Sequence, residues 1–407
     1  MANTRVAFLL ILLLSGRAAV DVVRAERPEA FVGLASNNSL VLRSPPEGQV
    51  LINGADFRTL LDTVEALKQQ VQATAKQLAA LRCTAVADTT TITGLDGGAK
   101  WIGGVRAGNG QIYLMPWVSP SVLIIDPATD TVDLTSITGF AATQWSGGVL
   151  ANSGKIYGVP FDASAVLIID PTSNTADTTS ITGITAGAPH SWFGGVAAPN
   201  GKIYCLPYGA RSVLIIDPAA NAADTTTITV AEGSGSWRYG VLAKDGKIYG
   251  VPDGATSVLI IDPDANTVDL TTISGLDSER VWFGGVLAAN GKIYCAPFFS
   301  KGSVLIIDPA GRSADTTTLS SPDWVGNPWE GPGVAAGNGR LYFPPNTAAS
   351  VLIVDPTSNT FDTTTLADLG AVTSKWIGLV QADNGKIYGV PHNAGSVLII
   401  RNVCEGV

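Results

Sequence analysis

The residue types that carry most enzyme chemistry are sparse in this chain. It has only two histidines, His190 and His392, and they fall in different copies of an internal repeat. Three carboxylates outside the repeated positions, Asp253, Glu279 and Glu330, are scattered along the sequence. Acid–base and metal chemistry both need such groups to converge, and neither a Gly-x-Ser-x-Gly elbow nor a Cys-x-x-Cys pair is present. We therefore expect no catalytic residue, no metal site and no cofactor.

The internal repeat must position these groups, and it fills most of the chain. Seven copies follow one another, and their opening tryptophans are 44 to 47 residues apart, a spacing typical of four-stranded β-propeller blades. The opening residues are Trp101, Trp145, Trp192, Trp237, Trp282, Trp329 and Trp376. The repeat predicts an all-β fold, a seven-bladed β-propeller over residues 83–407.

The fifth copy displays the four strands expected in each blade. Strand a begins at Trp282, and the Asn290-Gly291 turn, which suits positive φ angles, leads to strand b. Strand c is the apolar run 304–307, which we expect to be buried on both faces. Strand d is the Asp-Thr-Thr-Thr stretch that begins at Asp315, because a polar outer strand resists pairing with other sheets.

The order of the strands is shifted so that the chain can close a ring. A strand d at 88–92 precedes the first tryptophan, and the last copy ends after its strand c at 397–400. The N-terminal strand is therefore predicted to complete the last blade. Cys83 and Cys404 flank this pair of strands, which has no covalent turn, so we predict a disulfide between them.

The other two cysteines occupy equivalent strand-b positions in copies three and five. Cys205 and Cys295 lie in blades that are not neighbours, so we expect two buried free thiols. Nothing near them in the sequence predicts the lowered pKa of a reactive cysteine.

The repeated phrases resemble a known propeller repeat. Gly-Val-x-Ala-x-Asn-Gly-Lys-Ile-Tyr followed by Ser-Val-Leu-Ile-Ile-Asp-Pro is similar to the YVTN-type repeat over about residues 88–400. The resemblance implies a propeller, and related propellers include surface proteins, binding modules and a few lyases and lactonases. The chain departs from that family in its opening tryptophan and in its Thr-rich strand d.

The seven copies differ mainly in the loops after strand b and before strand a, which share one rim of a propeller. We expect this rim to bind the ligand, because several of its loops carry aromatic residues that can stack or make contacts. The alternative is that these aromatic side chains only cover the ends of the blades. The candidate ligand-binding residues are Trp117, Phe161, Tyr208, Arg238, Tyr239, Phe298, Phe299, Trp324, Glu330 and His392.

The residues before the repeat form three predicted segments. Residues 1–25 are predicted to be a signal peptide, and 26–55 a short β segment in which 39–44 pairs with 49–53. Residues 56–82 carry a heptad pattern that predicts a coiled coil, either a homodimer or a homotrimer. The alternative is one amphipathic helix packed on the propeller. Asn37 is the predicted glycosylation site.

Composition narrows the classes of partner. The net charge is −9, which disfavours nucleic acid and anionic membranes, and no stretch predicts membrane insertion. The sequence favours a secreted, oligomeric recognition or adhesion protein whose propeller binds a glycan or a protein. An enzyme of the lyase or lactonase type, with its site at the mouth of the channel, and a structural coat or matrix protein are the alternatives.

Overall fold

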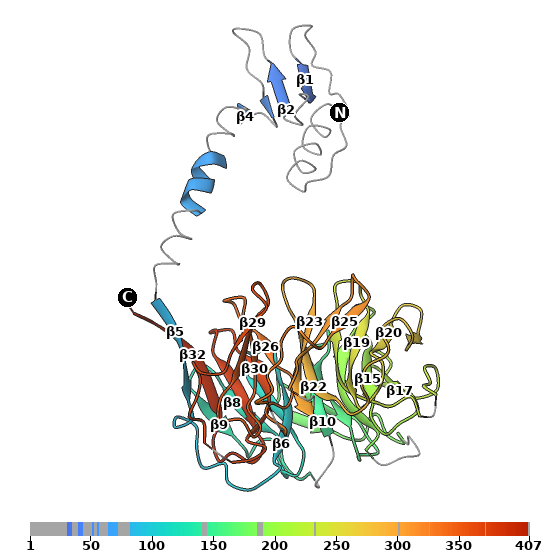
Figure 1. The fold of residues 1–407 in the computed structure, drawn as a ribbon. Coiled ribbons are helices and arrows are strands. Elements are labelled where there is room, and N and C mark those ends of the chain that lie inside the picture. The colour runs from blue at the N-terminus through green and yellow to red at the C-terminus, as the bar shows by residue number, and fades with distance from the viewer. Residues whose placement is uncertain are drawn as a thin grey trace. The chain divides into compact units, whose positions relative to one another are not determined.

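The computed structural model describes residues 31–34, 40–43, 51–52, 55–56, 64–71 and 82–405, apart from 141–144, 185–189, 232, 300–301, 325 and 371. Nearly all of its regular structure is β-strand (Figure 1). The chain divides into two compact units, one of residues Met1–Cys83 with Cys404–Val407 and one of Thr84–Val403. The larger unit holds the repeat.

The larger unit consists of four-stranded antiparallel sheets. Five sheets have four strands, and one has eight because a single pairing, Asp253 with Val281, joins two four-stranded groups. We number the four-stranded groups one to seven by the order of their first strands. The first strands are β6 (Trp101–Arg106), β10 (Trp145–Leu150), β14 (Trp192–Ala197), β18 (Ser236–Leu242), β22 (Val281–Leu287), β26 (Val334–Ala335) and β30 (Trp376–Gln381).

The remaining strands follow in the order that the repeat predicts. The second strands are β7 (Ile112–Pro116), β11 (Ile156–Pro160), β15 (Ile203–Pro207), β19 (Ile248–Asp253), β23 (Ile293–Phe299), β27 (Leu341–Phe343) and β31 (Ile387–Pro391). The third strands are β8 (Leu123–Asp126), β12 (Leu167–Asp170), β16 (Leu214–Asp217), β20 (Leu259–Asp262), β24 (Leu305–Asp308), β28 (Leu352–Asp355) and β32 (Leu398–Glu405). The fourth strands are β9 (Thr131–Asp133), β13 (Thr175–Asp177), β17 (Ala222–Asp224), β21 (Thr267–Asp269), β25 (Ser313–Asp315), β29 (Thr360–Asp362) and β5 (Arg82–Asp88).

The prediction for strand d was wrong in its bounds. In the fourth strands β9 to β29 the strand ends at the aspartate, and the Thr-rich residues after it form a turn around that side chain. In the first sheet, the Asp133 carboxylate accepts hydrogen bonds from the Thr135 amide, at 2.7 Å, and from the Ser136 hydroxyl. These bonds lower the pKa of Asp133 to about 2, and the bond from the Ser136 hydroxyl has the largest effect. The Asp133 carboxylate thus accepts the hydrogen bonds of the residues that follow it, in place of a neighbouring strand.

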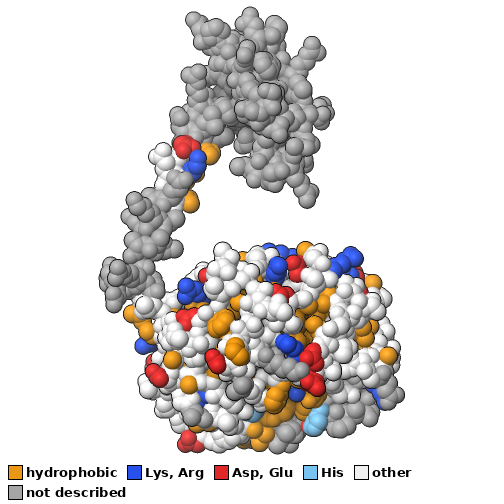
Figure 2. Space-filling model, in the orientation of Figure 1, with side chains coloured by type: hydrophobic (Ala, Val, Ile, Leu, Met, Phe, Trp, Pro, Cys, Tyr) orange, Lys and Arg blue, Asp and Glu red, His pale blue; other side chains and the backbone are white. Residues whose placement is uncertain are grey.

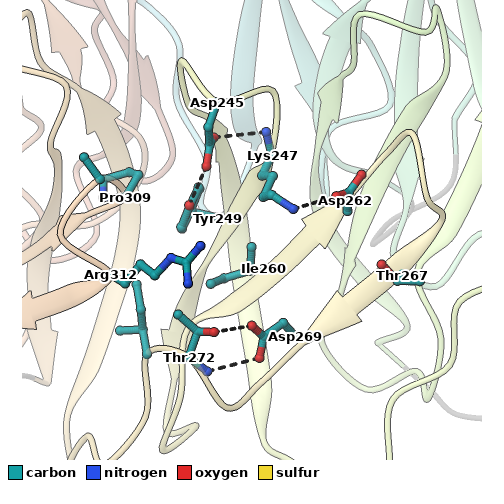
Figure 3. A pocket seen from close by; sticks show the side chains of 12 residues that line it. Asp245, Lys247, Tyr249, Ile260, Asp262, Thr267, Asp269, Thr272, Pro309 and Arg312 are labelled. Carbon is teal, nitrogen blue, oxygen red and sulfur yellow. Dashed lines mark hydrogen bonds and ion pairs between the residues drawn. The ribbon is translucent and has the colours of Figure 1, made fainter.

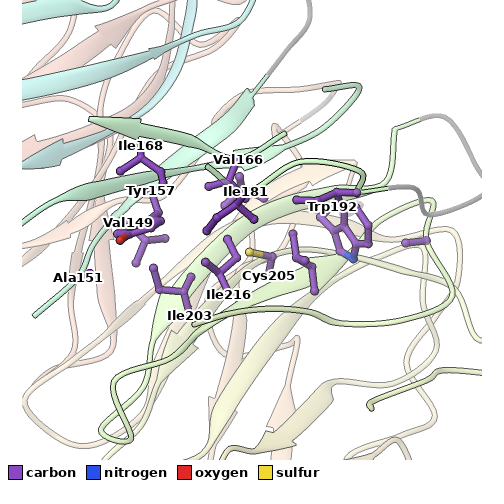
Figure 4. Close-up of a cluster of buried hydrophobic side chains, with 14 residues drawn as sticks. Val149, Ala151, Tyr157, Val166, Ile168, Ile181, Trp192, Ile203, Cys205 and Ile216 are labelled. Atoms are coloured by element: carbon purple, nitrogen blue, oxygen red, sulfur yellow. The ribbon is translucent and has the colours of Figure 1, made fainter. Parts of the chain in front are cut away.

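The core lies between consecutive sheets. One cluster joins Tyr157 and Ile168 of the second sheet to Trp192, Ile203 and Cys205 of the third (Figure 4). All seven opening tryptophans are buried, at 0 to 4 % exposure. Each donates its indole N–H to a backbone carbonyl 20 or 21 residues further on. The tryptophans therefore pack and fix the sheets.

The two cysteines inside the repeat are free thiols, as predicted. Cys205 and Cys295 are both fully buried, and burial raises the pKa of each thiol. A thiol that stays protonated is a weak nucleophile.

The strand at the start of the repeat lies in the last sheet. The order of that sheet is β30-β31-β32-β5, and an additional bridge joins Thr93 to Ser396. Cys83 lies in β5 and Cys404 in β32, but both side chains are outside the described residues. We expect peptide mapping without reduction to find these two cysteines linked. A Cys83–Cys83 link between chains would contradict this prediction.

The described parts of the smaller unit are short. β1 (Phe31–Leu34) pairs with β2 (Leu40–Arg43), and β3 (Leu51–Ile52) pairs with β4 (Ala55–Asp56). The predicted pairing of 39–44 with 49–53 was therefore wrong, because each of these strands pairs with its nearer neighbour. Residues 64–71 are helical. The predicted signal peptide and Asn37 lie outside the described residues.

Candidate binding site

The second residue of the Trp-led motif brings several sheets together at the centre of the larger unit. Residues from sheets one, three, five and seven meet there in one buried cluster, which is possible only where the first strands converge. Each first strand contacts the first strand of the next sheet, and β30 contacts β6. The seven residues at this position are Ile102, Ser146, Phe193, Arg238, Phe283, Glu330 and Ile377.

Tyr239 closes the centre beneath these side chains. It stands where most copies have glycine, and it adopts the positive φ of +56° that the position requires. Its side chain crosses the centre, since a Cβ on Gly194 of the third sheet would meet Tyr239 Cδ1 at 2.5 Å and one on Gly103 of the first sheet would meet its hydroxyl at 3.2 Å. The hydroxyl is buried and has no hydrogen bond within the described part of the chain. Tyr239 therefore fills the centre where the first strands converge.

Aromatic rings continue from Tyr239 across several sheets. Phe161 lies 4.6 Å from Trp117 and 6.0 Å from Tyr208, between ring centroids. Phe193 lies 5.4 Å from Phe283, which lies 5.5 Å from Phe298. We call the aromatic row the set Trp117, Phe161, Phe193, Tyr208, Tyr239, Phe283 and Phe298. Figure 2 shows hydrophobic side chains gathered beside a histidine at the lower edge of the larger unit.

Arg238 lies over the aromatic row and pairs with an acid. Its guanidinium carbon lies 4.7 Å from the ring centroids of both Tyr208 and Phe283, in cation–π geometry. The guanidinium also forms an ion pair with Asp253 and donates to the Tyr208 hydroxyl at 2.9 Å. The side chains of Arg238 and Asp253 are 17 and 11 % exposed, so this pair is largely desolvated.

Glu330 brings a second carboxylate to the same place. It is only 9 % exposed, and its carboxylate accepts a hydrogen bond from the Asn346 amide. Burial raises the pKa of Glu330 to about 7, against the opposing effects of Arg238 and Asn346. Burial likewise raises the pKa of Asp253, against the attraction of Arg238. Two carboxylates therefore face one guanidinium.

This convergence corrects the view that all the acids are scattered, since two of the three, Asp253 and Glu330, meet at Arg238. Asp253 comes from the end of β19 in the fourth sheet, whereas Glu330 precedes β26 in the sixth, where the residues Gly331 and Pro332 delay the start of the strand. Arg238 interacts with both carboxylates. No sequence pattern links positions so far apart, because their proximity depends on how the first strands converge.

The aromatic residues of the predicted rim are less exposed than expected. Trp117, Tyr208 and Phe298 are half-buried, Phe161 is 6 % exposed, and of the predicted residues only Phe299 is well exposed, at 52 %. The alternative that aromatic side chains cover the sheet ends therefore describes Phe161 well.

Two further predicted residues, Trp324 and His392, are also outside the aromatic row. Trp324 packs on Trp329 and Phe361, with centroids 5.0 and 4.6 Å apart, against the core between sheets five and six. The His392 ring nitrogen Nδ1 lies 3.1 Å from the Trp101 carbonyl, and burial lowers the pKa of His392.

Sequence reasoning missed several residues of the site. Phe193, Phe283 and Asn346 belong to it but were not among the candidates. The signal for the two phenylalanines was present, since both follow an opening tryptophan at the position that varies between copies. His190 stacks on Phe161 at 4.6 Å, and its Nδ1 lies 3.1 Å from Asp162, so it extends the aromatic row.

The opposite rim repeats one contact between neighbouring sheets. The Asn200 amide donates to the Pro263 carbonyl of the next sheet at 3.0 Å, and the Tyr204 hydroxyl donates to Asn266 at 3.0 Å. Between sheets four and five, Asp245 and Arg312 replace the two asparagines. A polar pocket of about 440 Å³ lies there, and the Arg312 side chain points into it (Figure 3). This rim is therefore chiefly structural.

The described residues include no group of three or more His, Cys, Asp or Glu side chains placed to hold a metal ion. Nor do they include a helix long and apolar enough to cross a membrane.

Solved structures show what fold this arrangement is. A catalytically inactive variant of virginiamycin B lyase from Staphylococcus aureus, solved with quinupristin, aligns over 78 % of this chain and 100 % of its own, at 11 % identity and a TM-score of 0.63. The extracellular domain of a two-component system protein from B. thetaiotaomicron aligns over 79 % of this chain and 42 % of its own, at 10 % identity and a TM-score of 0.58. Hydrazine synthase from Kuenenia stuttgartiensis aligns over 79 % of this chain and 98 % of its own, at 16 % identity and a TM-score of 0.55.

The larger unit is a β-propeller. At such low identities these likenesses show the fold alone. No protein-family model matches the sequence, and a search of curated proteins finds no match. The propeller is therefore shown, whereas the YVTN-type repeat remains a resemblance.

Proposed function

We propose that this protein is a secreted recognition or adhesion protein that binds a glycan or another protein at the centre of its propeller, beside the aromatic row. The observation that carries the proposal is the aromatic row with Arg238 above it. It lies at the positions where the repeats differ, whereas the opposite rim repeats one structural contact. Aromatic and arginine side chains are the residues that most often dominate binding energy.

We infer that the propeller has seven blades and that β5 closes its ring. The strand order of the last sheet supports this, as do the contacts from the seventh sheet to the first. The Asn384 amide donates to the Pro127 carbonyl at 2.8 Å, and the Tyr388 hydroxyl donates to Asp130 at 2.6 Å. The last sheet is thus joined to the first by the same kind of contact that joins the third sheet to the fourth.

Secretion is part of the proposal. The predicted signal peptide at 1–25 motivates it, and one similar solved structure is an extracellular domain. N-terminal sequencing of protein from the culture medium would locate the cleavage. A product that retains residues 1–25 inside the cell would contradict this part.

We further propose that the chain forms a homodimer or homotrimer through residues 56–82. Within the described helical residues 64–71, Val64, Leu67 and Val71 fall on the heptad positions a and d and are 53, 55 and 66 % exposed. Such a stripe is stabilised by burial against a second copy. We expect the full chain to be oligomeric in light scattering and a chain without residues 26–82 to be monomeric. A full chain that is monomeric would contradict the coiled coil.

The binding proposal is tested by removing three rings of the aromatic row. We expect the combined substitutions Trp117→Ala, Tyr208→Ala and Phe298→Ala to weaken ligand binding at least about tenfold, since truncating one such residue often costs about 2 kcal/mol. The ligand would come from a glycan array and a screen of secreted proteins, and the affinity from calorimetry.

Phe361→Ala is the matched control for this experiment. Phe361 is also aromatic and 38 % exposed, but it lies on the outer strand β29 away from the aromatic row. We expect the control to bind like the parent protein, and a thermal melt would verify that all variants fold. Unchanged binding by the triple variant, or an equal loss in the control, would show that the ligand binds elsewhere.

One observation favours an enzyme, of lyase or lactonase type, as the second candidate. A carboxyl group whose pKa is about 7, as burial gives Glu330, suits proton transfer at neutral pH. One variant distinguishes the enzyme from the binding protein. In an enzyme Glu330→Gln would abolish turnover and leave substrate bound, whereas in a binding protein no substrate would be consumed by either form.

A further inference from the structure

The central charges do not balance. Among the described residues, Arg238 is the one cation that acts on Glu330, and it is already ion-paired with Asp253. When both acids are ionised, the group carries one carboxylate more than it has cations. Burying an unpaired charge is costly, and burial accordingly raises the pKa of Glu330, so that the free protein holds this proton up to about pH 7. A ligand that supplied a positive charge would remove the need for that proton.

Hydrogen-bond acceptors beside Glu330 are also unsatisfied. Asn346 is 1 % exposed, and it donates from Nδ2 to Glu330, so its oxygen Oδ1 lies close to the same carboxylate. This oxygen has no hydrogen bond within the described part of the chain, and the Tyr239 hydroxyl has none either. Buried polar atoms are rarely left unpaired. An amide oxygen can only accept, so the Asn346 oxygen calls for a donor, whereas the Tyr239 hydroxyl can donate or accept.

The surrounding rings also favour a cation. The faces of Phe283 and Tyr208 already hold the Arg238 guanidinium at 4.7 Å, which shows that these rings accept positive charge. The two lysines that directly precede opening tryptophans, Lys100 and Lys375, make their hydrogen bonds to backbone carbonyls. Lys100 donates to the carbonyls of Gly97, His392 and Ala394, and Lys375 donates to those of Ala348 and Val372. Neither lysine supplies the missing cation.

We propose that the site binds the ammonium group of an amino sugar, held by Glu330 and the Asn346 oxygen, while neighbouring sugar rings stack on the half-buried rings of Trp117, Tyr208 and Phe298. The inference rests on the proposed binding function and narrows it to a glycan with free amino groups. A glycan fits better than a lysine side chain, because the partly buried rings of Trp117, Tyr208 and Phe298 pack against the same central cluster. A lysine side chain has no ring of its own to stack on them.

The probes are a tetramer of glucosamine and a tetramer of N-acetylglucosamine, titrated calorimetrically into the full chain at pH 7. Acetylation removes the positive charge and keeps the ring. We expect the amino tetramer to bind at least about tenfold more tightly, and Glu330→Gln to remove that preference. Asp264→Asn, which neutralises an exposed acid on the opposite rim, is the matched control and should retain the preference.

A pH series with pentylamine isolates the ammonium subsite, because this amine stays protonated from pH 5.5 to 8. We expect its affinity to rise about tenfold per pH unit up to about pH 7 and then to level off, as Glu330 loses its proton. In Glu330→Gln this rise should be absent. The charged and titratable groups acting on Glu330 are Arg238, Asp253 and Tyr239, and the comparison with the variant subtracts their effects.

Three results would overturn the inference. These are equal binding of the two tetramers, a preference that survives in Glu330→Gln, and binding of a lysine peptide by a protein that binds neither tetramer. If the two tetramers bind equally and binding of the acetylated tetramer still depends on Trp117, Tyr208 and Phe298, the proposed binding function stands while the ammonium subsite fails. A thermal melt of Glu330→Gln verifies that the variant folds.

Discussion

Replacing Arg238 by methionine is expected to lower the free energy of unfolding by about 3–5 kcal/mol at pH 8. The substitution keeps an unbranched side chain but removes the cation that pairs with Asp253 and attracts Glu330. Breaking a buried ion pair from one side leaves its partner charged and desolvated, which costs more than the pair itself contributes. Urea unfolding followed by tryptophan fluorescence measures the difference.

Two further variants make this result interpretable. Arg106→Met breaks the ion pair with Asp383, whose side chains are 40 and 71 % exposed, and should cost less than about 1 kcal/mol. Adding Asp253→Asn and Glu330→Gln to Arg238→Met removes the stranded charges and should restore most of the lost stability. If Arg238→Met costs no more than Arg106→Met, the central charges are better solvated than their burial indicates.

The scaffold was predictable because its signals are local and repeated. A glycine at positive φ in each turn, such as Gly110 at +83°, and apolar runs such as 123–125 identify the strands without reference to distant residues. The sequence misplaced the outer strand for an equally local reason. A Thr-rich stretch has high strand propensity, but the preceding aspartate, such as Asp133, satisfies its amides and ends the strand.

The site was only partly predictable because it depends on the ring. Variation between copies drew attention to Arg238, Tyr239 and Glu330. It did not show that Asp253 meets Arg238, because Asp253 belongs to the end of a second strand whose position relative to the first strand is set by packing. Exposure was also misjudged, since Phe161 is covered by its neighbours Trp117 and Phe193.

Glu330→Gln is expected to stabilise the protein at pH 8 and to have little effect at pH 5. Burial raises the pKa of Glu330 from 4.5 to about 7, so the folded state holds this proton more tightly than the unfolded chain. The stability contributed by this group is therefore present in full below about pH 4.5 and is lost as the pH rises to about 7. The difference corresponds to about 3 kcal/mol.

Glutamine has the same shape and carries no charge to desolvate, so the free energy of unfolding of the variant does not undergo that loss as the pH rises. Comparing the variant with the parent at pH 5, 6, 7 and 8 cancels the titration of the acids that do not interact with Glu330, including the turn aspartates whose pKa values lie near 2. Asp264→Asn, at an exposed turn, should show a difference that does not change over this range. A Glu330→Gln difference that is equally constant would mean that Glu330 is ionised throughout, held by Arg238 and Asn346. The protein would then carry its surplus charge without a ligand, and the case for an ammonium at this position would lose its main physical reason.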